Sequence, residues 1–181
     1  MTDSREKGIT AVELLIAVAV LAILVGASMP LFLSAIQTSR FDGAVRRIVS
    51  DLRYTQSLAV TNGGCYGLHS GSDPLVGRPN EYRIERGGCN GVGWPAPTDT
   101  MATNANVITE WYNLGQEFDG VSITSLRDNA NINVNGVIFN SRGASVNPFI
   151  AVAYPVRITV ANAPGGTRTI EVRSTGSVKL P

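Results

Sequence analysis

One apolar run near the amino terminus constrains this chain more than any other feature. Between Ile9 and Ile36, apart from Gly26 and Pro30, only four residues are not apolar: Thr10, Glu13, Ser28 and Ser34. A helix needs about 20 apolar residues to cross the hydrocarbon core of a bilayer. The segment from Leu14 to Ile36 has that length, since Gly, Ser and Pro are tolerated in membrane helices. The sequence therefore predicts a membrane-spanning helix.

A cleavable secretory signal is the first alternative for this run. The apolar core of such a signal is usually about 7–15 residues long and ends near a small-x-small cleavage site. Ala27-Ser28-Met29 imitates that site, but the apolar run continues beyond it to Ile36. Acidic residues also offset the basic ones in the first seven positions. A secreted β-domain with an ordinary signal peptide is therefore the less favoured interpretation.

The carboxylate of Glu13 lies inside the apolar run and needs an explanation. A carboxylate at the centre of a membrane helix costs about 2.5–3.5 kcal/mol on insertion scales, and the cost falls toward the helix end. Such an acid calls for a cationic partner, which a new amino terminus at Ile9 or an amine on a neighbouring subunit would supply. The alternative is that Glu13 only reaches the headgroup zone.

The segment "KGITAVELLIAVAVLAILVGASMPLF" resembles the class III signal of type IV pilins and pseudopilins. That family has a polar leader ending in Gly, then a mature helix with Glu at position five and Pro at position twenty-two. Counted from Ile9, Glu13 is fifth and Pro30 is twenty-second. The resemblance implies that a prepilin peptidase cuts between Gly8 and Ile9 and methylates the new amine. It also implies that Glu13 pairs with the terminal amine of an adjacent subunit, although Ile9 replaces the usual Phe.

We expect four segments: a leader at 1–8, a transmembrane and assembly half of the helix at 9–36, an amphipathic half at 37–62, and a β-rich globular domain at 63–181. Pro30 is expected to kink the helix, because proline lacks an N–H and clashes with the preceding turn. In the amphipathic half, apolar residues recur at helical spacing and should pack on a sheet. They are Phe41, Val45, Ile48, Leu52 and Leu58-Ala59. Asn62-Gly63-Gly64 should end the helix.

Short β-like runs separated by turn residues follow. We expect strands at Cys65–His69, Glu81–Arg86, Val107–Tyr112, Val121–Leu126, Ile132–Val134, Val137–Phe139, Val156–Val160, Thr169–Arg173 and Val178–Leu180. Asn135-Gly136 predicts a two-residue hairpin, and Ala163-Pro164-Gly165-Gly166 separates another strand pair. No helical pattern interrupts these runs, which favours an antiparallel sheet or β-sandwich. The predicted class is α+β, the pilin fold, with the long helix packed on the sheet.

Two features of the globular part bear on partners. The stretch from Gly87 to Asn106 is a long loop, and such loops are often functional or mobile. Trp94 within it is interpreted as a packed anchor, with partner contact as the alternative. Cys65 and Cys89 fit neither a metal knuckle nor a CxxC redox pair. In an exported domain they would form a disulfide, and otherwise they would be two separate buried thiols.

The sequence shows no recognisable catalytic chemistry. His69 is the sole histidine, and no Ser/His/Asp set, P-loop or zinc cluster is present. Cys65 with His69 would be a nucleophile and base, but nothing else supports hydrolysis. The acidic residues of the globular part, Glu85 among them, are interpreted as an ordinary solvated surface. We therefore predict a protein that is not an enzyme and that needs no cofactor or metal.

Three later segments narrow the resemblance to the GspH/FimT branch. "DLRYTQSLAVTNGGCYGL" is similar to its helix end and first strand, "GVIFNSRGAS" to a strand-turn through Phe139 and Gly143, and "TIEVRSTGSVKL" to its closing strands with Gly176 at the turn. Some members of this branch bind DNA through a Gly-Arg-x-Arg patch, but here both arginines are missing after Gly176. A less favoured DNA contact set remains: Arg157, Arg168, Arg173 and Lys179.

The resemblance implies a minor pilin or pseudopilin subunit that assembles into, primes or caps the filament of a type IV pilus or a type II secretion system. Its expected partners are other pilins through the helix, the prepilin peptidase and the inner membrane. The chain would cross that membrane once, with the globular domain in the periplasm, before it enters the filament. A filament-tip DNA receptor for uptake is the alternative. The sequence is compatible with a type IV pilus and with a type II secretion system, and with a position at the tip or in the shaft of the filament.

Overall fold

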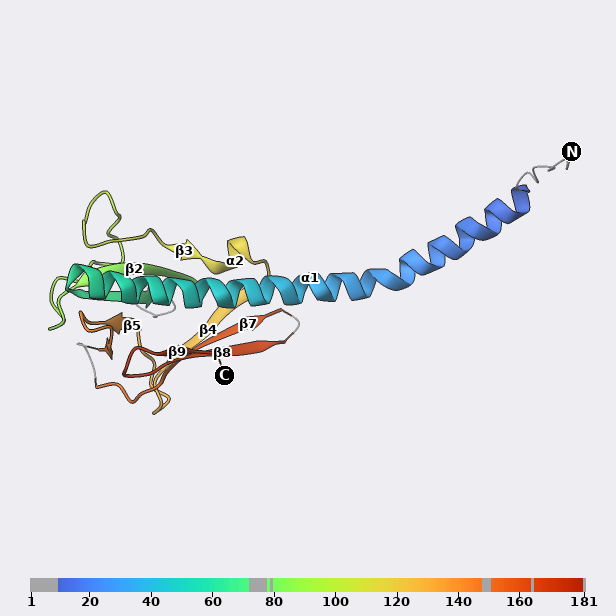
Figure 1. Ribbon diagram of the computed structural model, residues 1–181. Coiled ribbons are helices and arrows are strands. Elements are labelled where there is room, and N and C mark those ends of the chain that lie inside the picture. The colour runs from blue at the N-terminus through green and yellow to red at the C-terminus, as the bar shows by residue number, and fades with distance from the viewer. Residues whose placement is uncertain (1–9, 72–77, 79, 148–150, 164, 181) are drawn as a thin grey trace, which may run out of the picture. The chain divides into compact units, whose positions relative to one another are not determined.

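The computed structural model describes residues 10–71, 78, 80–147, 151–163 and 165–180 (Figure 1). The chain divides into two compact units, Met1–Ser39 and Arg40–Pro181, which we call the N-terminal and C-terminal units. Helix α1, Ala11–Asn62, contributes to both units.

Helix α1 ends at Asn62, where the sequence predicts, whereas its predicted start at Ile9 lies outside the described residues. The helix continues through Pro30, and the kink expected there stays a prediction. At the other end Gly63 adopts a positive φ of 66°, and the amide of Gly64 donates to the carbonyl of Ala59 at 3.3 Å. Glycine adopts this left-handed conformation without steric cost, so the predicted terminator at Asn62-Gly63-Gly64 is confirmed.

The rest of the C-terminal unit consists mainly of two antiparallel sheets. The first has the order β3-β2-β1-β5-β6, with the strands Tyr112–Asn113, Glu81–Gly87, Cys65–Ser70, Gly136–Phe139 and Ser145–Val146. The second has the order β4-β7-β8-β9, with the strands Val121–Arg127, Val156–Asn162, Thr167–Val172 and Val178–Lys179. Together with α1 they make the α+β class that the sequence predicted.

The core of this unit forms where α1 meets both sheets. Phe41, Val45, Ile48, Leu52 and Ala59 are each at most 5% exposed. They belong to one apolar cluster with residues of the first sheet, such as those of β1 and β5, and of the second, such as those of β7 and β8. The predicted stripe is thus confirmed, and burial of its apolar surface holds the helix onto the sheets.

Most predicted strands are present, but Val107–Tyr112 is not a continuous one, and Ile132–Val134 forms only an isolated bridge at Asn133. In the first of these segments only Val107 forms an isolated bridge, to Glu85, before the two-residue strand β3. Between them the amide of Ile84 donates to the hydroxyl of Thr109 at 2.9 Å instead of to a backbone carbonyl. A side chain that takes the place of a ladder acceptor interrupts regular pairing.

The hairpin predicted at Asn135-Gly136 is wrong. The residues before it pair with β4, through the Arg127–Asn133 bridge and a bond from the amide of Val134 to the carbonyl of Leu126. Gly136 instead opens β5 and pairs with His69 of β1 in the other sheet. A Cβ at position 136 would overlap His69 and the backbone of β1. The glycine is therefore needed for close strand approach where the chain changes sheets.

Two short elements were not predicted. The single-turn helix α2, Leu114–Glu117, begins at Asn113, whose side chain accepts from the amide of Gly115. A four-residue helix is too short to show a helical period, so the expectation of uninterrupted strands was wrong. Strand β6 has only two residues and shows no alternation either. The predicted turn at 163–166 does connect β7 to β8, which pair antiparallel.

Candidate functional site

Glu13 lies in the first turn of α1, where it forms a reciprocal pair with Thr10. The backbone amide and the hydroxyl of Thr10 donate to Glu13 Oε2 at 2.9 and 3.0 Å, and the amide of Glu13 lies 3.3 Å from the hydroxyl of Thr10. This arrangement is a capping box, which satisfies amides that a helix start leaves without partners. The predicted processing residues Gly8 and Ile9 lie outside the described residues.

The N-terminal unit presents an almost fully exposed apolar helix. Side chains such as Leu15, Ile23 and Phe32 are 67–71% exposed. This part of α1 is long and apolar enough to cross a membrane, and its apolar segment is not buried within the chain. Water penalises such exposure, so the segment needs lipid or other apolar helices around it.

In the C-terminal unit, one side chain of α1 joins the ends of both sheets. The Nε2 of Gln56 donates to the carbonyl oxygens of Gly143, at 2.7 Å, and Gly176, at 3.2 Å. Both glycines have positive φ, 74° and 82°, in turns that follow β5 and β8. A Cβ at Gly176 would overlap the carbonyl of Gly143, so the two turns are in contact. The two glycines of the predicted branch motifs therefore meet at Gln56.

The long loop after β2 covers one face of β1 and β2. A disulfide joins Cys65 to Cys89 across its base, with a Cα–Cα distance of 5.3 Å. Trp94 packs against the His69 ring at 4.9 Å and donates its Nε1 to the carbonyl of Gly88 at 3.1 Å. A Cβ at Gly87 would overlap the indole ring. Trp94 is therefore packed against the sheet, as predicted. Cys65 and Cys89 form a disulfide, so the alternative of two separate buried thiols is wrong.

A buried ionic cluster lies beneath this loop, where a solvated surface was expected. Glu85 is 2% exposed and Arg83 is 1% exposed. The Nε of Arg83 donates to Glu85, and its other nitrogens donate to the carbonyls of Ala96 and Asp99 at 2.8 and 2.7 Å. Arg83 also lies under the Trp111 ring at 4.5 Å. The interpretation of Glu85 as a surface residue was therefore wrong, because β2 is covered on both faces.

His69 belongs to the same cluster and takes no part in a nucleophilic pair. Its Nδ1 is 2.6 Å from Glu85 Oε2, but the contact lacks the geometry of a hydrogen bond, and that oxygen and His69 Nε2 are buried without hydrogen bonds. Cys65 is in the disulfide and has no free thiol. The Cys65–His69 nucleophile and base that we considered is thereby ruled out. Among the described residues, no group of His, Cys, Asp or Glu side chains is placed to hold a metal ion.

The four predicted DNA-contact residues do not line one face. Arg157 is paired across β7 and β8 with Glu171, Nε to Oε1 at 3.1 Å, and Lys179 is the register partner of Glu171 on β9. Arg168 is three residues before Glu171 on β8, so its side chain lies on the opposite face of the strand. It forms an ion pair with Asp42 of α1, with Nη2 and Oδ1 3.0 Å apart. Arg173 lies in the turn after β8. Alternation along β8 separates Arg168 from the others, so the common face is not formed.

A second polar contact ties α1 to the first sheet. The hydroxyl of Tyr82 donates to Asp51 Oδ2 at 2.7 Å, and Arg47 binds the same carboxylate at 3.1 Å. Burial, with a contribution from Asp51, raises the pKa of Tyr82, so the phenol keeps its proton and remains a donor. No motif in the sequence pointed to Asp51, Tyr82 or Gln56, since each looks like an ordinary polar residue of its element.

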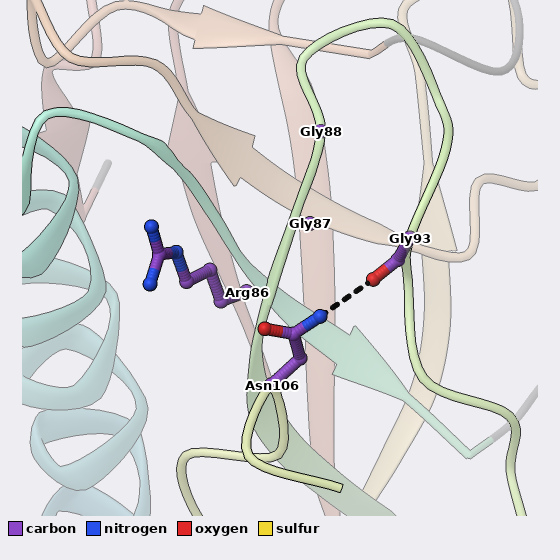
Figure 2. Close-up of a pocket in the computed structure, with 5 residues that line it drawn as sticks. All are labelled: Arg86, Gly87, Gly88, Gly93 and Asn106. Carbon is purple, nitrogen blue, oxygen red and sulfur yellow. Dashed lines mark hydrogen bonds between the residues drawn. The ribbon is translucent and has the colours of Figure 1, made fainter.

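An open pocket of about 420 Å³ lies where the loop leaves β2, lined by Arg86, Gly87, Gly88, Gly93 and Asn106. Figure 2 shows the Asn106 amide bonded to the carbonyl of Gly93, a 2.9 Å contact, and Arg86 extending away from Gly93. The lining offers one cation and backbone groups, and it contains no nucleophile or general base. The described residues that line this pocket therefore form no catalytic constellation.

Comparison with known proteins finds one matching sequence family and several similar solved structures. The model of the family "Type II transport protein GspH" matches residues 44–176. No curated protein matches the chain. The similar solved structures include the type IV minor pilin FimU of Pseudomonas aeruginosa, 12% identical with a TM-score of 0.49, covering 77% of this chain and 91% of that one. They also include the minor pseudopilin EpsH of the Vibrio cholerae type 2 secretion system, 11% identical with a TM-score of 0.49, covering 78% and 96%.

Proposed function

Because this chain belongs to the GspH family, whose model covers most of its length, we infer that it is a minor pilin or pseudopilin. It is a non-enzymatic subunit of a type IV pilus or type II secretion filament, and its partners are other pilins or pseudopilins. The observation that supports this function best is the exposed apolar helix of the N-terminal unit, joined in sequence to a folded, disulfide-bonded C-terminal unit.

We propose that the helix is stored in the inner membrane and then transferred into a bundle of like helices. The globular unit lies on the periplasmic side, where oxidising conditions suit the Cys65–Cys89 disulfide. A prepilin peptidase removes residues 1–8, and the new amine of Ile9 is methylated. In the bundle the apolar side chains that the isolated chain leaves exposed are covered by neighbouring helices.

We further propose that Glu13 pairs with the terminal amine of an adjacent subunit. Within one chain, Glu13 Oε2 is occupied by Thr10, while no contact of Oε1 is seen among the described residues. In an apolar bundle an uncompensated carboxylate would be costly, and breaking a buried pair costs about 3–5 kcal/mol. The pair would therefore fix the axial register of one helix against the next.

Mass spectrometry of the chain purified from membranes tests the processing step. We expect the mature polypeptide to begin at Ile9 and to carry one added methyl group. A polypeptide that begins near Met29 would contradict the proposal and support the secreted β-domain. A filament-associated chain that keeps residues 1–8 would contradict it too, because the amine that pairs with Glu13 would be absent.

A further inference from the structure

In the C-terminal unit, helix α1 is buried on only one side. Ile48, Leu52 and Ala59 belong to the core, whereas the side turned away from the core is exposed. Exposed residues on that side recur at alternating spacings of four and three positions, which places them on one face of the helix. They are Arg46, Ser50, Arg53, Ser57 and Val60, and we call them the free face of α1.

The two cations of the free face have no carboxylate partner among the described residues. Arg46 and Arg53 are exposed and form no ion pair there, whereas the neighbouring Arg47 is bound to Asp51. They are seven positions apart, which is two turns and roughly 10 Å along the helix axis. Two full charges at this spacing are therefore available to a partner.

The free face has the spacing by which two helices pack side by side. An average repeat of 3.5 residues is the seam of a helix pair. Ser50 and Ser57 have short side chains, so a neighbouring helix can approach closely between the arginines. Val60, which is 53% exposed, adds an apolar contact at the end of the face. A matching helix would carry carboxylates seven positions apart, opposite Arg46 and Arg53.

A second copy of this chain does not meet that requirement. If two copies packed in parallel through their free faces, Arg46 and Arg53 of one would face the same arginines of the other. Like charges placed together across an interface oppose association. Asp42 and Asp51 are the acidic residues of this half of α1, and both are already bound within the chain. The helix of another copy therefore brings the wrong sign of charge.

We propose that Arg46 and Arg53 dock an acidic helix of a different pilin-type subunit, and that the same two charges keep copies of this chain apart. This inference rests on the proposed function, because α1 is the element that enters the bundle of like helices. Specificity arises from attraction to one neighbour together with repulsion of another. Both effects suit a minor subunit, whose neighbours in a filament are other pilins.

The number of cations favours a protein helix over a nucleic acid. Nucleic-acid binding draws most of its affinity from several phosphate contacts. The free face supplies two cations, and the chain as a whole has a net charge of +1. Two charges are sufficient to steer and align a helix that carries two opposite ones.

A variant of this chain supplies an acidic helix for the first test. Arg46→Glu with Arg53→Glu places two carboxylates on the free face. Full chains labelled at the C-terminus are reconstituted in phosphatidylcholine liposomes, and association is measured by energy transfer at low and high salt. We expect the native chain alone and the variant alone to associate weakly. An equal mixture should associate at least about tenfold more strongly at low salt, because opposite charges then meet.

The matched control is a mixture of the native chain with Arg142→Glu and Arg173→Glu. These arginines are exposed in the turns after β5 and β8, so the same change of net charge lies off the free face. The proposal is overturned if the mixture with the free-face variant associates no more strongly than its components. It is also overturned if the gain persists at high salt, or if the control mixture gains as much. A misfolded variant would not give a gain that depends on salt and on position.

A photo-crosslinking residue on the free face identifies the neighbour in intact filaments. We expect Ser57→benzoylphenylalanine to crosslink to a helix of a different pilin-type subunit, within about two turns of an Asp or Glu residue. The yield should fall at least about fivefold when Arg46→Glu and Arg53→Glu are added. Crosslinks to a second copy, to lipid or to nucleic acid would overturn the proposal.

The filament experiment also separates this contact from the subunit function on which it rests. If the native chain is absent from filaments, the proposed function itself fails. If the native chain is present and the charge variant enters filaments with an unchanged crosslink yield, the subunit function stands and only the role of Arg46 and Arg53 fails.

Discussion

The side-chain amide of Gln56, on the long helix, donates to the backbone carbonyl of Gly143 at 2.7 Å. The same nitrogen reaches Gly176 at 3.2 Å, so one residue of α1 fixes the turns that end β5 and β8. The two sheets share apolar contacts with α1, but these contacts are non-directional. Gln56 adds a directional bond that sets where the ends of the two sheets meet.

Replacing Gln56 by Ala should destabilise the C-terminal unit by about 1–3 kcal/mol, because two carbonyls in a partly buried place lose their donor. Urea unfolding of the full chain in mild detergent, followed by near-ultraviolet circular dichroism, measures the change. The control is Ser57→Ala, at an exposed neighbour on the same helix, which should stay within about 0.5 kcal/mol. Equal effects of the two substitutions would contradict the role given to Gln56.

Glu85→Gln should cost about 3–5 kcal/mol, because it leaves the buried guanidinium of Arg83 without its counter-charge. Since Arg83 holds the carbonyls of Ala96 and Asp99, we also expect the covering loop to loosen and the tryptophan dichroism to weaken. The matched control is Glu81→Gln, whose partner Arg78 is half exposed, and it should cost less than about 1 kcal/mol. A loss for Glu85→Gln no larger than that of the control would show that the cluster is not stabilising.

Asp128 should make stability fall in acid. Bonds from the backbone amides of Ile132 and Ala153 lower the pKa of its carboxyl below the usual value, although burial acts in the opposite direction. A carboxyl whose pKa is lower in the folded than in the unfolded chain stabilises the fold when it is ionised. Its contribution is complete above the pKa of the unfolded chain, about 3.9, and is lost as the pH falls through the pKa of the folded chain. The free energy of unfolding, measured between pH 6 and pH 2, should therefore fall less steeply for Asp128→Asn than for the native chain. Parallel curves for the two chains would contradict this linkage.

The sequence allowed the elements with strong patterns to be predicted. The helical stripe from Phe41 to Ala59 and the terminator at Gly63 were visible because periodicity and glycine chemistry are local. The alternating strands of the second sheet were visible for the same reason. The first 30 residues also indicated the type of subunit, because the landmarks of the family signal stand at fixed positions along one segment.

What could not be predicted depends on distant contacts. Asn135-Gly136 has the composition of a hairpin, yet Gly136 serves close packing on β1, a strand more than 60 residues earlier. Glu85 resembles a surface acid until the loop that covers it is in place. The role of Gln56 also depends on two turns that are 87 and 120 residues away in the chain. Local propensity carries no information about such pairings.

Helix capping, which the structure shows, and the proposed pairing with a neighbouring subunit are two separate roles of Glu13, and substitutions at position 10 distinguish them. Thr10→Ala removes the two bonds that the Thr10 hydroxyl makes, while the backbone amide of residue 10 and the Glu13 carboxylate stay in place. Loss of a cap costs about 0.5–2 kcal/mol of helix stability, which membrane or bundle burial of the rest of α1 should tolerate. If the capping box were the only role of Glu13, Thr10→Ala and Glu13→Ala would behave alike.

The most direct measurement is therefore the fraction of each chain that enters sheared filaments, with membrane insertion of the remainder as the internal control. The account predicts that Glu13→Ala inserts normally but is nearly absent from filaments, whereas Thr10→Ala enters them at close to the native level. Normal incorporation of Glu13→Ala, or equal exclusion of both variants, would contradict the claim that this carboxylate binds the amine of a neighbouring subunit.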